Sequence, residues 1–180
     1  TAFLIPEGDL VRIRYFSPTI EIDLCGHATL ASAFVLFHFW GMKGTILRFR
    51  TRKRGDLFVF EKDETLWLDF PSDRFQASDI PAITEEALGK YPVEAYKGTN
   101  DLMLVYRDEK DISAIEPHFD RLATIAARGV LVTAPGKEVD FVSRFFAPQV
   151  GIPEDPVTGS AHTLLIPYWS ERLGKTRMIA

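Results

Sequence analysis

Cysteine and histidine are scarce in this sequence: Cys25 is its single thiol, and there are four histidines. One cysteine excludes an internal disulfide and a zinc site built from several cysteines. The histidines show no spacing typical of metal ligands, so we expect no metal site. A reducing, cytoplasmic environment fits this use of cysteine best.

Positive charge is not in excess either, because 21 Lys and Arg residues stand against 25 Asp and Glu residues, for a net charge of -4. Nucleic-acid-binding proteins are usually basic, so we expect no nucleic-acid partner. We interpret the one basic cluster, at residues 48–54, as the solvated face of a strand that leads into a turn. Hydrophobic residues make up 46% of the chain and charged residues 26%, which is typical of a folded protein.

A stretch without Asp, Glu, Lys or Arg covers residues 24–42 and is nearly long enough to cross a bilayer. Its densely apolar part is shorter, at residues 30–37. Gly26, His27 and His38 would bring polar groups into hydrocarbon. We therefore predict a helix that is buried all round within the fold and ends at Gly41, and we expect no membrane partner.

The hydrophobic pattern predicts an α+β protein with antiparallel or mixed sheets. A polar stretch after residue 70 suggests an N-terminal half at residues 1–72 and a C-terminal half at 73–180. Strands are predicted at residues 1–5, 11–16, 21–24, 46–52, 57–61, 66–70, 93–97, 101–106, 130–134 and 139–146, with a strand break at 17–19. Besides the helix that ends at Gly41, helices are predicted at residues 83–89, 119–128 and 160–173, and a loop at 151–159.

Two segments of the chain resemble each other. The segment Asp23-Leu24-Cys25-Gly26-His27-Ala28-Thr29 and the segment Asp155-Pro156-Val157-Thr158-Gly159-Ser160-Ala161-His162 each lead into a helix without charged residues in its first turns. Each helix is predicted to end at a glycine 15 positions after the glycine at its start. A helix buried all round needs a sheet curved about it, so we predict two similar halves, each a sheet rolled around one central helix.

The repeat also suggests a chemistry. A helix N-terminus has unpaired N–H groups and partial positive charge, and a glycine lets a ligand approach them. Two such starts facing each other would form a cleft for an anion such as a carboxylate, with His27, Asp155 and Ser160 around it to exchange protons with a substrate. The alternative is that Asp155 and Ser160 only cap the second helix and that His27 is packed in the core.

Residues 21–33 (EIDLCGHATLASA) closely resemble the first signature of the PhzF-like, phenazine-biosynthesis-like isomerase family. Residues 154–162 (EDPVTGSAH), continuing through Pro167-Tyr168-Trp169, are similar to its second signature. The resemblance implies the diaminopimelate-epimerase-like fold, with two pseudo-symmetric halves and an active site in the cleft between them. It also implies a homodimer that moves a proton on a small carboxylate-bearing molecule, without a cofactor or a metal.

The resemblance implies a set of site residues as well. The catalytic positions are His27, Asp155 and Ser160, and the substrate-binding positions are Gly26, Ala28, Thr29, Thr158 and Gly159. In the related epimerases two cysteines act across the cleft as base and acid. Cys25 occupies the place of the first, but this chain has no second cysteine, so we interpret Cys25 as a structural thiol.

One departure from the family concerns the start of the chain. The family's main acid/base is a glutamate immediately before the position of Thr1, and the family continues with strands after residue 180. We therefore expect a fragment that lacks strands at both ends, and no isomerase activity from the 180 residues alone. The alternative function is a catalytically inactive module of the same fold that binds a small anion or another protein.

Overall fold

A computed structural model describes residues 1–16 and 20–180 of the chain. The strand break expected at residues 17–19 lies outside the described residues. The chain divides into two compact units, unit 1 (Thr1–Pro71) and unit 2 (Ser72–Ala180), and each is described by itself. Both units combine helices with a mixed sheet, so the α+β class is confirmed.

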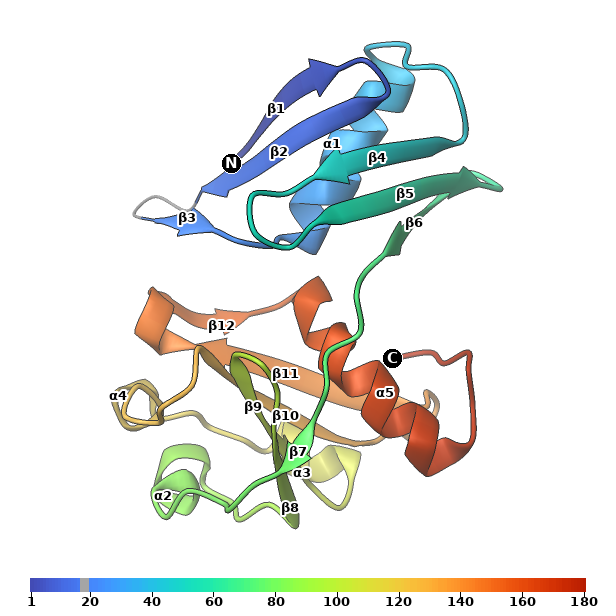
Figure 1. The fold of residues 1–180 in the computed structure, drawn as a ribbon. Coiled ribbons are helices and arrows are strands. Elements are labelled where there is room, and N and C mark those ends of the chain that lie inside the picture. Colours follow the sequence, from blue (N-terminus) through green and yellow to red (C-terminus); the bar gives the residue numbers. More distant parts are fainter. Residues whose placement is uncertain (17–19) are drawn as a thin grey trace. The chain divides into compact units, whose positions relative to one another are not determined.

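Within residues 1–16 and 20–71, unit 1 contains one helix and one mixed sheet of six strands (Figure 1). The strands run in the spatial order β1-β2-β4-β5-β6, and β3 pairs with the edge of β2. The pairing of β2 with β4 is parallel, and the others are antiparallel. The elements are β1 (Ala2–Glu7), β2 (Leu10–Phe16), β3 (Glu21–Ile22), α1 (Gly26–His38), β4 (Ile46–Arg50), β5 (Asp56–Lys62) and β6 (Thr65–Asp69).

In β2 and β4, apolar residues that face the core alternate with mainly basic residues that face away, as the period of a half-buried strand requires. The exposed residues of β1, β5 and β6 include Phe3, Phe60 and Trp67. In β2, Val11 and Ile13 are buried in a core that includes Leu36 of α1, whereas Arg12 and Arg14 are exposed. The face of the sheet that α1 does not cover therefore carries the arginines.

Unit 2 contains a second mixed sheet of six strands, in the order β12-β11-β10-β9-β8-β7. The pairing of β9 with β10 is parallel, and the others are antiparallel. Its strands are β7 (Gln76–Ala77), β8 (Glu94–Lys97), β9 (Asp101–Val105), β10 (Gly129–Pro135), β11 (Phe141–Ala147) and β12 (Ile152–Asp155). Its helices are α2 (Thr84–Leu88), α3 (Glu109–Ser113), α4 (Phe119–Leu122) and α5 (His162–Leu173), with 3₁₀ turns η1 (Pro148–Val150) and η2 (Gly159–Ala161).

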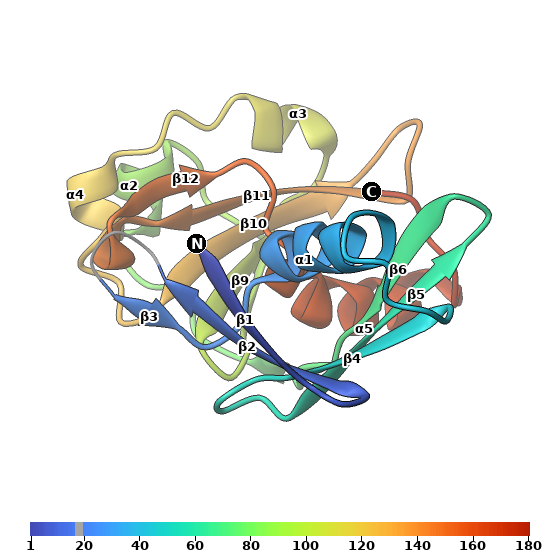
Figure 2. The same ribbon diagram turned by 90° about the horizontal axis from the view of Figure 1, so that it is seen from above.

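The sheet of unit 2 is covered on both faces, unlike the sheet of unit 1 (Figure 2). Leu104 and Val132 belong to the core beneath α2, α3 and α4. Met103 and Leu131, their neighbours along the same strands, belong to the core beneath α5. Because neighbouring residues of a strand point to opposite faces, β9 and β10 are buried along nearly their whole length and are mostly apolar, with Asp101 and Thr133 as their polar residues.

The same succession of elements occurs in both units. In unit 1 the hairpin β1-β2 is followed by the short strand β3 at the edge of β2, and then by α1. In unit 2 the hairpin β10-β11 is followed by β12 at the edge of β11, and then by η2 and α5. The two similar segments noticed in the sequence therefore occupy the same place in this succession.

The predicted helix at residues 119–128 is wrong beyond Leu122, where α4 ends. The side-chain amide of Gln149 donates hydrogen bonds to the carbonyl oxygens of Ala123, at 2.7 Å, and of Ile125. A continued helix would pair those carbonyls with backbone N–H groups four residues later. The contact with Gln149 thus replaces a turn of helix.

The loop predicted at residues 151–159 is also wrong in part, because β12 pairs with β11 there. Pro153 cannot donate to a sheet, but β12 is an edge strand, where proline is tolerated. Two short elements, β7 and α3, were not predicted, and α3 begins with a capping box formed by Asp108 and Asp111. The other strands and helices agree with the predictions to within a few residues at their ends.

Neither long helix is buried all round, so that prediction is wrong. The single sheet of unit 1 covers one side of α1 and leaves Phe34 47% exposed, and Ile166 on α5 is 38% exposed. The end of α1 also differs from the prediction, because its C-cap is Phe39. Gly41 follows two residues later in the left-handed region, whereas Gly174 is the left-handed C-cap of α5, as predicted. The described residues contain no helix that is long and apolar enough to cross a membrane.

Candidate active site

The start of α1 is held by hydroxyl groups inside unit 1. Cys25 is the extended N-cap residue, and its carbonyl oxygen accepts hydrogen bonds from the backbone N–H of Thr29 at 3.1 Å and from the Thr29 hydroxyl at 2.8 Å. The Tyr15 hydroxyl lies 2.6 Å from the Thr29 oxygen. Because the Thr29 hydrogen is used on Cys25, Tyr15 is the donor in that contact. Burial raises the pKa of Tyr15 to about 12.

His27 lies in the first turn of α1, and its side chain is exposed. The interpretation of His27 as a packed core residue is therefore wrong. The Cys25 Sγ atom lies 3.5 Å from Nε2 and 3.7 Å from Nδ1 of the His27 ring. Gly26 and Thr29 are buried beside His27, and Ala28 is half-buried.

The start of α5 is built differently, with a turn before the helix. Asp155 ends β12, and its carboxylate accepts a hydrogen bond from the backbone N–H of Val157 at 3.2 Å. The Thr158 hydroxyl donates to the Asp155 carbonyl oxygen at 3.4 Å. Gly159 and Ser160 then form η2, which passes directly into α5.

Neither Asp155 nor Ser160 caps the helix, because no side-chain cap is present at η2 or at α5. The alternative interpretation of these two residues as caps is therefore wrong. No partner for the Ser160 hydroxyl is found among residues 1–16 and 20–180. The Ser160 carbonyl oxygen accepts a hydrogen bond from the Thr163 hydroxyl at 2.7 Å. His162 Nδ1 lies 3.2 Å from the Thr158 carbonyl oxygen.

The structure thus gathers the site residues predicted from sequence into two groups. His27 lies with its neighbours Gly26, Ala28 and Thr29 in unit 1, and Asp155 lies with Thr158, Gly159 and Ser160 in unit 2. That the two groups face each other across a cleft stays a prediction. Tyr15 and Thr163, which hold the two helix starts, were not found from the sequence. Tyr15 alternates with the core residues of β2, a pattern that indicates packing. No sequence pattern therefore marked these two residues as supports of the helix starts.

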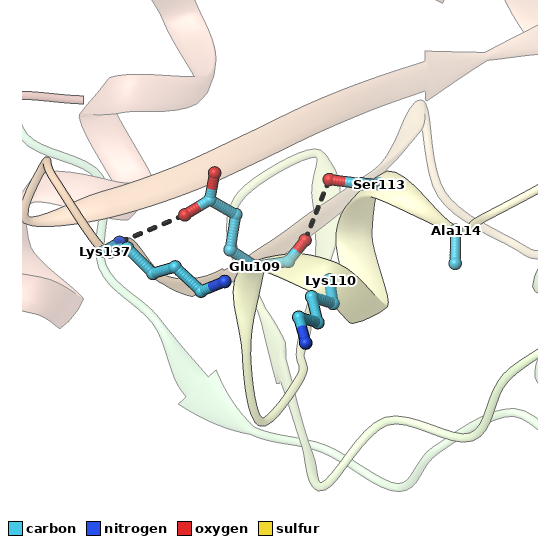
Figure 3. A pocket seen from close by; sticks show the side chains of 5 residues that line it. All are labelled: Glu109, Lys110, Ser113, Ala114 and Lys137. Atoms are coloured by element: carbon cyan, nitrogen blue, oxygen red, sulfur yellow. Dashed lines mark hydrogen bonds between the residues drawn. The ribbon is translucent and has the colours of Figure 1, made fainter.

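A pocket in unit 2 lies on the side of its sheet that carries α3 (Figure 3). The Glu109 carboxylate accepts a hydrogen bond from the backbone N–H of Lys137 at 3.0 Å. The residues that line the pocket are Glu109, Lys110, Ser113, Ala114 and Lys137. The pocket contains none of the residues predicted for the site.

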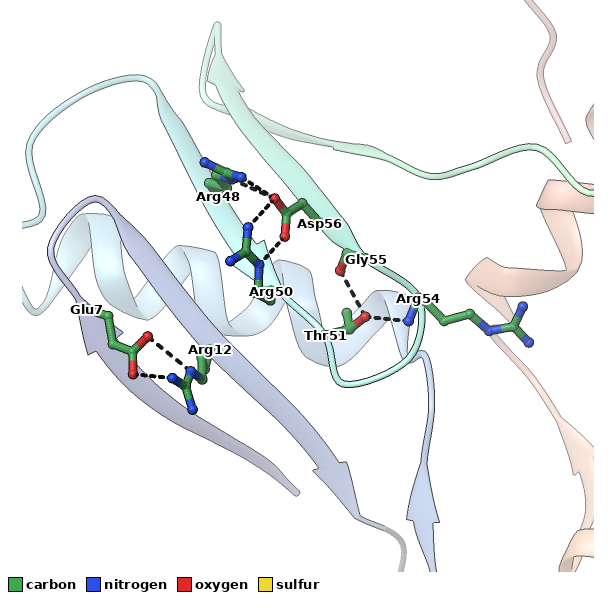
Figure 4. A network of polar contacts seen from close by, with 8 residues as sticks. All are labelled: Glu7, Arg12, Arg48, Arg50, Thr51, Arg54, Gly55 and Asp56. Carbon is green, nitrogen blue, oxygen red and sulfur yellow. Dashed lines mark hydrogen bonds and ion pairs between the residues drawn. The ribbon is translucent and has the colours of Figure 1, made fainter.

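The basic cluster at residues 48–54 begins on the exposed face of β4 and continues into a turn, as predicted (Figure 4). Arg48 and Arg50 both contact the carboxylate of Asp56, and Arg50 and Arg48 hold the pKa of that carboxyl well below its usual range. Arg52 contacts Glu21 at 2.8 Å. Asp56 serves two arginines and Glu21 pairs with Arg14 as well as with Arg52, so the carboxylates offset only part of the positive charge of this face.

Comparison with protein families gives a match over almost the whole chain. The profile of a family described as phenazine biosynthesis-like protein matches residues 1–179. An uncharacterized isomerase of Pseudomonas aeruginosa is 49% identical over 180 residues, which are 100% of this chain and 69% of that protein. An uncharacterized isomerase of Halalkalibacterium halodurans is 40% identical over 184 residues, again 100% of this chain and 69% of that protein.

Solved structures agree with these sequence matches. The crystal structure of a PhzF-family phenazine biosynthesis protein from Enterococcus faecalis has a TM-score of 0.91 and 46% identity, over 98% of this chain and 68% of that one. A PhzC/PhzF protein from Clostridium difficile has a TM-score of 0.87 and 37% identity, over 99% of this chain and 68% of that one. A predicted epimerase from Pseudomonas aeruginosa, with 17% identity and a TM-score of 0.65 over 98% of this chain and 68% of that one, shows likeness of fold alone.

Proposed function

This chain belongs to the phenazine biosynthesis-like (PhzF) protein family, and we propose that it carries the carboxylate-binding and proton-exchanging groups of a cofactor-independent isomerase. The substrate is a small metabolite with a carboxylate group. Relatives that share nearly half of the sequence are named isomerases, which supports the reaction class.

The observation that carries the proposal is the pair of uncapped helix starts. The first backbone hydrogen bond of α1 is donated by Thr29, so the N–H groups of Gly26, His27 and Ala28 have no acceptor within the helix. At the other start the first such bond is donated by Ala161, after Gly159 and Ser160. Neither α1 nor α5, both described in full, has an acidic residue in its first turn. Both starts therefore favour an anion.

The proton chemistry is assigned to side chains next to these N–H groups. The carboxylate of Asp155 takes a proton from a substrate carbon, and the protonated ring of His27 gives one to another position. Proton exchange of both groups with water then restores them for the next turnover. The Ser160 hydroxyl, which has no partner among the described residues, donates a hydrogen bond to the bound carboxylate. Asp155 is half-buried beside the turn it forms with Val157, which fixes the direction of its carboxylate.

The same proposal includes the finer architecture. We propose that the shared succession of hairpin, edge strand and helix marks two pseudo-symmetric, epimerase-like halves whose helix starts meet in one cleft. We also propose a homodimer in solution. Sedimentation equilibrium of the intact protein tests the dimer, and a concentration-independent monomer mass contradicts it.

Substrate-carbon exchange in D₂O, with the intact protein and a panel of small cyclic carboxylates, tests the chemistry. We expect deuterium at one carbon of the substrate with a longer chain that includes the residue before Thr1, and none with the Asp155→Ala variant of that longer chain. The matched control is Asp79→Ala, which removes an exposed carboxylate of the same unit. Equal exchange by the Asp155→Ala variant would contradict the proposed role of Asp155.

An NMR titration with benzoate tests binding separately from proton exchange. We expect shifts of the backbone N–H signals of Gly26, His27, Gly159 and Ser160. Shifts of these signals without deuterium exchange at any substrate would favour the inactive anion-binding module. Signals that stay in place at saturating benzoate would contradict the carboxylate site itself.

A further inference from the structure

Asp73 joins two distant parts of unit 2 just after the chain enters that unit at Ser72. Its backbone N–H donates a hydrogen bond to the Thr163 carbonyl oxygen, in the first turn of α5, at 2.9 Å. Its carboxylate accepts two hydrogen bonds from Thr99, at 2.9 Å from the backbone N–H and at 2.6 Å from the hydroxyl. The segment that links the units is thus fixed to the turn between β8 and β9 and to α5.

The Thr163 carbonyl is free to accept this bond because of a proline. In an α-helix the carbonyl of residue 163 would accept a hydrogen bond from the N–H of residue 167. Residue 167 is Pro167, which has no N–H. The backbone N–H of Asp73 takes the place of the missing donor. The proline inside α5 therefore creates a docking point for the linking segment.

The packing around Gly98 is independent evidence that Asp73, α5 and the turn between β8 and β9 meet. A Cβ atom at residue 98 would lie 2.8 Å from Oδ2 of Asp73 and 3.0 Å from Cδ2 of Leu164 on α5. Contacts that short require a neighbour to move. The absence of a side chain at Gly98 is what lets the Asp73 carboxylate and α5 approach the β8–β9 turn together.

Asp73 is connected to the candidate site through a single residue, Thr163. The hydroxyl of Thr163, whose carbonyl receives the Asp73 N–H, donates to the Ser160 carbonyl oxygen at 2.7 Å. Ser160 belongs to η2, the turn whose N–H groups precede the helix. A displacement of Asp73 would therefore reach the Ser160 backbone through a single residue.

We propose that Asp73 is a positioning residue: it docks the linking segment on the carbonyl left free by Pro167 and so holds residues 158–160 in the geometry that receives a carboxylate. The role in binding rests on the proposed function of this site. The anchoring itself does not, so the two are tested by different readouts.

Amide hydrogen exchange and benzoate affinity of Asp73→Ala and Asp73→Asn test the proposal, with Asp79→Ala as the matched control. In Asp73→Ala we expect the amides of Thr99 and Ala161, which donate to Asp73 and to the Thr158 carbonyl oxygen, to exchange about tenfold faster, as the loss of about one net hydrogen bond predicts. We expect benzoate to bind several-fold more weakly. The free energy of unfolding of α5, measured by exchange of its central amides, should stay unchanged. Asp73→Asn keeps one of the two acceptor oxygens that Thr99 uses and should recover part of both losses.

Pro167→Ala separates this role from general stability. It restores an N–H that competes for the Thr163 carbonyl, and it removes a residue that is unfavourable inside a helix. We expect the protein to be at least as resistant to urea, yet the Asp73 amide to exchange several-fold faster. If the Asp73 amide exchanged as slowly in Pro167→Ala as in the unchanged protein, the lack of an N–H at residue 167 would not be the reason that the linking segment binds the Thr163 carbonyl.

Failure of the carboxylate site and failure of the positioning role of Asp73 give different results. If the unchanged protein does not bind benzoate, the carboxylate site is wrong, and the exchange rates still decide whether Asp73 anchors residues 158–160. If the unchanged protein binds benzoate, and Asp73→Ala matches it in both affinity and exchange, the positioning role is overturned. Faster amide exchange or weaker benzoate binding in the Asp79→Ala control, equal to that in Asp73→Ala, would also count against a specific role for Asp73.

Discussion

The starts of α1 and α5 use the same few residue types but are held by different parts of the molecule. At α1, a threonine three residues after Gly26 bonds back to Cys25 and receives the Tyr15 hydroxyl from β2. At α5, the threonine is four residues after Gly159, and it bonds back to Ser160 while its carbonyl receives Asp73. The extra residue at α5 coincides with the 3₁₀ turn η2.

The start of α1 is fixed by residues in the core of unit 1, whereas the start of α5 is fixed by Asp73 in the linking segment. Tyr15 and Thr29 are both buried, so the hydroxyl pair at α1 is part of the core of unit 1. Asp73 and Thr163 are only half-buried, and Thr99 is exposed. Hydrogen bonds near the surface exchange with water, whereas buried ones leave an unsatisfied group when broken. Stability should therefore depend more on the α1 start than on the α5 start.

The largest expected effect is at Thr29. Thr29→Val keeps the shape of the side chain but leaves the buried Tyr15 hydroxyl without its acceptor, at a cost of about 1–3 kcal/mol in the free energy of unfolding. Urea unfolding followed by residue-resolved NMR of unit 1 measures the cost. Thr29→Ser, which keeps the hydroxyl, is the control and should lose much less. An equal loss in both variants would mean that the methyl group, and not the hydrogen-bonded pair, stabilises this start.

The next effect is the alkaline stability of unit 1. Because burial raises the pKa of Tyr15 from 10.0 to about 12, its contribution is complete below pH 10 and is lost as the pH rises through 12. We expect unit 1 of Tyr15→Phe to lose less stability over that interval than the unchanged protein does. Residue-resolved NMR is needed, because burial also raises the pKa of Tyr106 and of Tyr168 in unit 2. Tyr91→Phe, at an exposed tyrosine, should behave like the unchanged protein.

The sequence predicts each element that depends on near neighbours. Alternation in β2 identified Val11 and Ile13 as core and Arg12 as solvent-facing, since a strand has a strict period of two. It predicted two similar helix starts because a glycine-containing turn before a charge-free run is a local pattern. The family resemblance then supplied His27, Asp155 and Ser160 as site residues.

What the sequence did not predict depends on partners far along the chain. The end of α4 depends on Gln149, more than twenty residues later, and the strand β12 depends on an edge offered by β11. Asp73 and Thr163 meet only because a proline frees one carbonyl. Pairings of this kind carry no periodic signal, so a pattern of apolar and polar residues does not reveal them.

The smallest expected effect is at Thr163, and it decides whether the comparison holds. Thr163→Val removes the hydroxyl that bonds to Ser160 and should cost about 0.5–1.5 kcal/mol in the free energy of unfolding, less than Thr29→Val, because water replaces the lost partner. The urea unfolding used for Thr29→Val measures it, with Thr163→Ser as control. Benzoate affinity should nevertheless fall more for Thr163→Val than for Thr29→Val, because η2 is held from outside the core. A cost at Thr163 equal to that at Thr29 would mean that both starts are fixed in the same way.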